Sequence, residues 1–60
     1  MNYKEANEIL WQAQKLAIEI EQNAKQYNKS IIGETAENTW HAITLLRGML
    51  AIDELNYEEK

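Results

Sequence analysis

The sequence predicts an all-α fold, an antiparallel helical hairpin whose two long helices span about 2–28 and 34–57 and that self-associates into a four-helix bundle or a larger helical assembly. Three observations predict it. Apolar residues recur at steps of three and four through the first half, only one short segment favours a turn, and the second half is apolar around a wide arc. We expect a single domain over residues 1–60.

The first helix is predicted from eight apolar or aromatic residues that follow one another at alternating steps of three and four. The series is Tyr3, Ala6, Leu10, Ala13, Ala17, Ile20, Ala24 and Tyr27. Such spacing is typical of a helix that packs lengthwise against other helices, and Ile9 and Leu16 widen the apolar stripe. Glu21 and Lys25 are one turn apart, where opposite charges stabilise a helix. We therefore expect the eight residues to form the contact face of this helix.

A turn is predicted over residues 28–35, the only segment in which turn-forming residues gather. Asn28 favours a turn, and Gly33 can adopt the left-handed conformation that ends or joins helices. Ile31 and Ile32 lie between them, and we expect both to fold back onto the end of the core.

The start of the second helix has two candidate N-caps, Ser30 and Thr35. We expect a start near Glu34, because Glu34 and Glu37 then lie in the first turn, where negative charge is favourable. A short connection between two long helices makes them antiparallel neighbours.

The second helix is predicted to be apolar around nearly half of its circumference. The residues of this arc are Ala42, Ile43, Leu45, Leu46, Met49, Leu50, Ile52 and Tyr57. One neighbouring helix buries a stripe of roughly 100°, so this helix needs two or three neighbours, whereas a hairpin offers one. We expect Ile43 and Leu50 in the core. Gly48, in mid-helix, is either tolerated on a solvated side or allows another helix to approach closely.

A chain of 60 residues buries a small core, and such domains depend on disulfides, a structural metal or oligomerisation. There is no cysteine, and the single histidine, His41, argues against a structural zinc site. Oligomerisation is the remaining route. The first predicted partner is therefore the chain itself, as a homodimer or a higher homo-oligomer.

The sequence contains no catalytic, metal-ligating or phosphate-binding motif, so we predict no enzyme activity, no cofactor and no metal. His41 is expected at the surface, beside Glu37 one turn earlier. A net charge of −4 and six singly scattered Lys or Arg residues argue against direct nucleic-acid binding. No apolar run is long enough to span a membrane and no secretory signal is recognisable, so we predict a cytoplasmic protein without membrane contact.

Two surfaces are predicted to remain for another protein once the core is filled. Trp11 and Ile18 lie seven residues apart on the back of the first helix, beyond the polar residues Asn7, Gln14 and Glu21. The second surface is the acidic open end of the hairpin. Its candidate residues are Asp53, Glu54, Glu58 and Glu59.

The predicted function is that of a small acidic helical interaction protein, a regulator, inhibitor or adaptor that works by protein–protein binding as a homo-oligomer. The composition, rich in Ile, Asn, Lys and Tyr, fits the AT-rich coding sequences of some bacteria, their phages and mobile elements. The alternative is an acidic mimic of nucleic acid that occludes a DNA-binding protein, for which carboxylates would stand in for phosphates.

Overall fold

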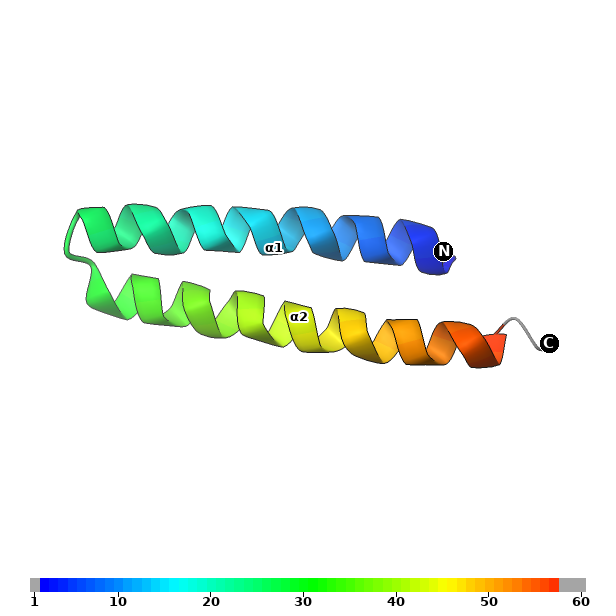
Figure 1. The fold of residues 1–60 in the computed structure, drawn as a ribbon. Coiled ribbons are helices and arrows are strands. Elements are labelled where there is room, and N and C mark those ends of the chain that lie inside the picture. The colour runs from blue at the N-terminus through cyan, green and yellow to red at the C-terminus, as the bar shows by residue number, and fades with distance from the viewer. Residues whose placement is uncertain (1, 58–60) are drawn as a thin grey trace.

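The fold is a helical hairpin, as predicted. The structure is a computed structural model that describes residues 2–57, with side-chain exposures as far as Asp53. Helix α1 spans Tyr3–Gln26 and helix α2 spans Ser30–Tyr57, and the two run antiparallel side by side (Figure 1). The described part of the chain contains no strand. The rod measures 49 × 15 × 11 Å, so it is one helix pair wide along its whole length.

Helix α1 begins with a side-chain cap. The Asn2 side-chain oxygen accepts a hydrogen bond of 2.9 Å from the backbone N–H of Glu5, and this carboxylate lies in the first turn. An Asn cap satisfies a backbone donor that the helix leaves free, and a first-turn acid complements the helix dipole. Alanine and long-chain residues then continue the helix without a break to Gln26.

The turn between the helices is made by Asn28, which has a positive φ of 58°. Asparagine tolerates this left-handed conformation better than other residues with a side chain. The backbone N–H of Lys29 donates to the carbonyl of Ala24 at 2.8 Å, which closes the end of α1. The chain has therefore already reversed before Ser30, where α2 begins.

The predicted start of the second helix near Glu34 is wrong by four residues, because Asn28 rather than Gly33 supplies the left-handed turn. Gly33 is a buried residue inside α2 with no positive φ. Ile31 and Ile32 do not fold back onto the core. They lie in the first turn of α2 and are 80% and 54% exposed.

The two helices approach each other through small residues. The buried apolar residues are Ala17, Ala24 and Ala36. A Cβ atom added at Gly33 would lie 3.5 Å from the Cβ of Ala24, so the glycine lets the helices come close beside the turn. No large side chain is fully buried within the part of the chain that the structure describes. The helix–helix contact is therefore a thin strip rather than a full core.

The contact face of α1 is rotated relative to the predicted series. Ile20 and Tyr27, predicted to face the core, are 52% and 60% exposed. The other six residues of the predicted series are buried or half-buried, and the contact face extends beyond them on the side that carries Asn7, Gln14, Ile18 and Glu21. The three polar residues of that side face α2 because α2 offers them hydrogen-bond partners.

Helix α2 presents its own strip to α1. The buried and half-buried residues there are Gly33, Ala36, Glu37, Trp40, Ile43, Arg47 and Leu50. Ile43 and Leu50, both predicted core residues, lie on this inner strip but are only half-buried in the isolated hairpin. The other large apolar residues of α2 point elsewhere.

Candidate functional site

The candidate site is an exposed apolar surface that runs along both helices. On α1, Ile9, Leu16 and Ile20 are each more than half exposed, and so is Tyr27 just after its end. They belong to a second series at steps of three and four beside the contact face. This series is Ala6, Ile9, Ala13, Leu16, Ile20, Asn23 and Tyr27. Because such a series occupies one side of a helix, these side chains form a stripe that α2 does not cover.

Helix α2 continues this surface on the same side of the hairpin. One shallow groove is lined by residues of both helices, including Ile20 of α1 and Ile32 of α2. A second groove further along α2 includes Leu46, and the two grooves share Thr35 and Thr39. The apolar surface is therefore continuous from one helix to the other. We call it the apolar face, defined by Ile9, Leu16, Ile20, Tyr27, Ile32, Thr35, Thr39 and Leu46.

The hairpin exposes more surface than a compact monomer of its size. The accessible area is 4900 Å², whereas a folded monomer of 7.0 kDa is expected to expose about 4,000 Å². The excess of about 900 Å² is close to the ~800 Å² that each partner buries in a standard protein–protein interface. The hairpin alone therefore exposes an additional area similar to the area that one partner buries in such an interface.

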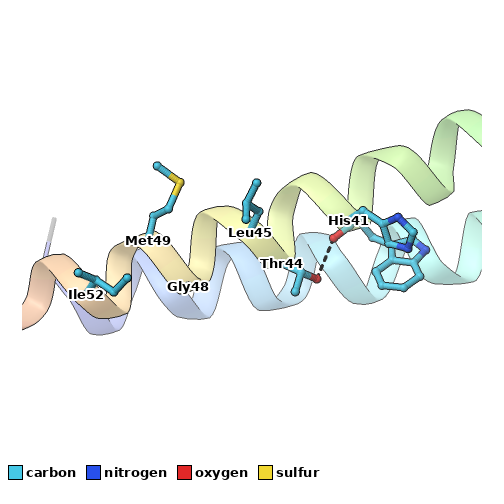
Figure 2. A pocket seen from close by; sticks show the side chains of 7 residues that line it. His41, Thr44, Leu45, Gly48, Met49 and Ile52 are labelled. Atoms are coloured by element: carbon cyan, nitrogen blue, oxygen red, sulfur yellow. Dashed lines mark hydrogen bonds between the residues drawn. The ribbon is translucent and has the colours of Figure 1, made fainter.

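A further groove, which is not part of the apolar face, lies on the outer side of α2 (Figure 2). We call it the outer groove. Leu45, Met49 and Ile52 line it, and all three are more than half exposed. Gly48 also lines it, and no atom of the described residues lies within 4 Å of the place where a Cβ would stand. The sequence left two interpretations of Gly48, tolerance on a solvated side or close approach of another helix. Within the hairpin, α1 does not approach Gly48 closely. Any close neighbour at Gly48 would have to come from outside the hairpin.

His41 lies at the edge of this outer groove and is exposed, as predicted. Its ring meets the Trp40 ring edge-on, with 4.1 Å between the centroids. The hydroxyl of Thr44 donates to the Trp40 carbonyl at 2.9 Å and is thereby occupied within the helix. Within residues 2–57 there is no group of three or more His, Asp or Glu side chains able to hold a metal ion.

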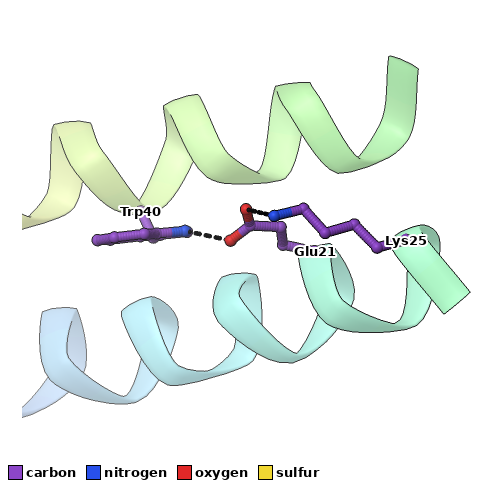
Figure 3. Close-up of polar contacts among 3 residues, drawn as sticks. All are labelled: Glu21, Lys25 and Trp40. Atoms are coloured by element: carbon purple, nitrogen blue, oxygen red, sulfur yellow. Dashed lines mark hydrogen bonds and ion pairs between the residues drawn. The ribbon is translucent and has the colours of Figure 1, made fainter. Parts of the chain in front are cut away.

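Polar side-chain contacts bridge the two helices of the hairpin (Figure 3). The Trp40 ring N–H donates to one oxygen of the buried Glu21 carboxylate at 2.7 Å. The Lys25 ammonium lies 3.0 Å from the other oxygen, which confirms the predicted Glu21–Lys25 pair. The Trp40 hydrogen bond, helped by Lys25, lowers the pKa of Glu21, and the same carboxylate raises the pKa of Lys25.

Arg47 forms the second bridge between the helices. Its Nε donates to the Asn7 side-chain oxygen at 3.0 Å, and one terminal nitrogen donates to the buried Gln14 side-chain oxygen at 3.0 Å. The guanidinium also lies 4.7 Å from the centroid of the Trp11 ring. A planar cation with several donors can make all three contacts at once, which lysine cannot.

The predicted Trp11 and Ile18 surface is therefore partly used inside the hairpin. Trp11 is 38% exposed, with Arg47 on it and the Lys15 ammonium 5.6 Å from its centroid, and Ile18 is half-buried. Among the acidic candidates, Asp53 is exposed. The side chain of Glu54, together with Glu58 and Glu59, lies outside the described residues.

The residues of the apolar face were only partly singled out by the sequence. Ile9, Leu16, Ile20 and Tyr27 were all predicted on the stripe that packs against other helices, and the structure shows that α2 leaves these four side chains exposed. The signal that separates the two sides is the set Asn7, Gln14 and Glu21. Three polar residues at a spacing of seven on a helix that also carries a continuous apolar stripe indicate a contact with specific polar partners.

Glu21 makes the stability of the hairpin depend on pH. A carboxylate whose pKa is lowered by folding stabilises the fold above its ordinary pKa of about 4.5 and loses that contribution as the pH falls through the folded value. We expect thermal stability to drop between pH 5 and pH 3 by more in the natural chain than in a Glu21→Gln variant. Circular dichroism melts across this range test it, and equal slopes for the two proteins would contradict it.

Comparison of the chain with known protein families, with curated proteins and with solved structures gives no match. Neither helix, over its described residues, is apolar along a stretch that could cross a lipid bilayer. The proposed function therefore rests on the exposed surfaces of the hairpin.

Proposed function

We propose that the chain is a non-enzymatic interaction protein that acts as a homo-oligomer, with the apolar face as its association surface. One observation carries the proposal. The buried residues of the contact strip are alanine, glycine and hydrogen-bonded polar residues, whereas the large aliphatic side chains are at best half-buried there and most of them are exposed outside the strip. In a chain that folds alone, the arrangement is usually the reverse.

The size of this exposed surface supports the proposal. Contiguous apolar patches larger than a few hundred Å² are rare on soluble monomers and generally mark an interaction site. The apolar face runs along both helices, and five of its residues, Ile9, Leu16, Ile20, Tyr27 and Ile32, are more than half exposed. Covering it with another copy supplies the burial that a chain of 60 residues lacks.

The site gives no comparable support to chemistry. The buried carboxylate of Glu21 accepts a hydrogen bond from Trp40 and pairs with Lys25, and the exposed His41 ring meets the Trp40 ring edge-on. These contacts hold the helices together and present no nucleophile with an adjacent base. A regulator, inhibitor or adaptor needs only a stable scaffold that displays a surface, which the hairpin provides.

Self-association predicts that the melting temperature rises with protein concentration. Raising the concentration 100-fold stabilises an assembled state by about 2.7 kcal/mol per association step, which corresponds to roughly ten degrees for a small dimer. Circular dichroism melts at 1 and 100 micromolar, at the same ionic strength, measure the shift. A midpoint that stays constant across this range, with the hairpin folded at both concentrations, would overturn the proposed homo-oligomer.

A further inference from the structure

We propose that the apolar face is covered by a second copy of the chain that lies antiparallel to the first, with α1 packed on α1 and α2 packed on α2. This inference rests on the proposed function and specifies its geometry. The twofold axis would cross α1 between Ala13 and Leu16 and α2 between Thr39 and Leu46. The result is a four-helix bundle in which each hairpin forms one layer.

The side-chain sizes along α1 fit this register. With the axis between Ala13 and Leu16, each Leu16 lies opposite the partner's Ala13, and each Ile9 lies opposite the partner's Ile20. A large side chain thus meets a small one, or two medium ones meet, at each level. Helical layers interdigitate when large and small residues face each other. A parallel closed dimer has its twofold axis along the helices and would instead place α1 over the partner's α2, so this matching of large and small residues along α1 would be lost.

The same axis serves α2. Within the hairpin, Gly33 lies beside Ala24, and Arg47 bonds to both Asn7 and Gln14, so residues 33–47 of α2 run alongside residues 24 to about 10 of α1. An axis that crosses α1 just after Ala13 therefore crosses α2 near its middle. There it places Leu46 opposite the partner's Thr39, again a large residue opposite a small one. One symmetry operation satisfies both helices, as a closed dimer requires.

The distribution of charge also favours the antiparallel copy. Among the described residues, the open end of the hairpin carries the acidic residues Glu5, Glu8 and Asp53 against Lys4, whereas at the turn Lys25 and Lys29 balance Glu34 and Glu37. A parallel copy would bring two acidic ends together. An antiparallel copy sets the turn of each chain over the open end of the other, which separates the like charges.

The chain has no cysteine, so an introduced thiol is the only one present and disulfide trapping reports the register directly. We would prepare Ile9→Cys and Ile20→Cys as separate chains. Each would be oxidised mildly alone and after the two were mixed, melted and cooled together. A disulfide needs the two Cα atoms within about 7 Å. In the antiparallel bundle, the two copies of position 9 are roughly 16 Å apart along the axis, since eleven residues rise 1.5 Å each.

The expected result is at least tenfold faster cross-linking in the mixture than in either variant alone. Leu45→Cys is the matched control, because it is apolar and exposed in the hairpin but lies on the outer side of α2. Cross-linking of Ile9→Cys alone as fast as in the mixture would overturn the antiparallel register. Faster cross-linking of Leu45→Cys would move the interface to the outer groove.

The pair Ala6→Cys and Asn23→Cys repeats the test at the ends of the α1 stripe without removing a large apolar side chain. The register again predicts that the mixture cross-links and that each variant alone does not. If the melting temperature rises with concentration but neither cysteine mixture cross-links faster than its single variants, the register is overturned and the proposed function stands. A chain whose melting temperature does not depend on concentration would overturn both.

Discussion

Replacing Ile20 with glutamate is expected to dissociate the assembly and leave the hairpin folded. Ile20 is 52% exposed in the hairpin, so a carboxylate there remains in water as long as the chain is alone. In the proposed bundle, the same carboxylate would be buried against the partner's Ile9 without a partner of opposite charge. Such burial costs about 3 kcal/mol at each of the two symmetric sites, so the dimer loses about 6 kcal/mol and association weakens roughly ten-thousandfold.

The measurement is the dissociation constant of Ile20→Glu by sedimentation, with the helical content followed by circular dichroism. Gln22→Glu is the control, because it adds the same charge on the exposed polar side of α1. We expect the control to associate within about threefold of the natural chain, which corresponds to surface substitution effects of ~0.5 kcal/mol. Equal affinities for Ile20→Glu and Gln22→Glu would exclude the α1 stripe from the interface.

Replacing Arg47 with alanine is expected to give the largest loss of stability among single truncations in the contact strip, about 2 to 3 kcal/mol. The substitution leaves the buried Gln14 side chain without its donor, and an unsatisfied buried polar group costs about 1–3 kcal/mol. It also removes the contact with Asn7 and the cation over the Trp11 ring.

Urea unfolding at a fixed protein concentration, followed by the fluorescence of Trp11 and Trp40, tests this prediction. Lys15→Ala removes the other cation near the Trp11 ring from an exposed position, so its effect should stay below about 0.5 kcal/mol. If Arg47→Ala and Lys15→Ala cost the same, Arg47 does not hold the helices together in the way the distances indicate.

The hairpin and the lengths of its helices could be predicted from the sequence because they depend on local signals. Apolar spacing, the absence of proline and one cluster of turn formers are enough to place two antiparallel helices. The start of α2 could not be placed, because Asn28 and Gly33 are both able to adopt the left-handed conformation. The choice between them depends on packing, since Gly33 is needed where α2 approaches Ala24.

The rotation of α1 could not be predicted because it depends on contacts between residues far apart in the sequence. Glu21 and Gln14 appear as surface residues when the helix is considered alone. They turn inward because Trp40 and Arg47 provide hydrogen bonds from the other helix. Polar partners nineteen and thirty-three positions away leave no local signature. The rotation leaves Ile20 and Tyr27, two members of the predicted contact series, exposed beside Ile9 and Leu16.

The role predicted for Trp11 and Ile18 as a docking surface for another protein stays a prediction, now with a defined setting. Trp11 already contacts Arg47, so a Trp11→Ala change would alter the hairpin as well as any outside contact. Ile18→Ala leaves the contact between Trp11 and Arg47 in place, so it separates a role in docking another protein from a role in holding the hairpin together better than Trp11→Ala does. In the proposed bundle this side of the hairpin remains uncovered, which keeps it open to a different protein.

The central claim is that a second copy covers the apolar face, and sedimentation equilibrium of the natural chain tests it most directly. At 50 micromolar and moderate salt, we expect a single species of about twice the chain mass of 7.0 kDa, shifting toward the chain mass on dilution. A folded, fully helical species of 7.0 kDa at that concentration would contradict the account, because the natural chain would then leave its apolar face uncovered although other copies are present to cover it.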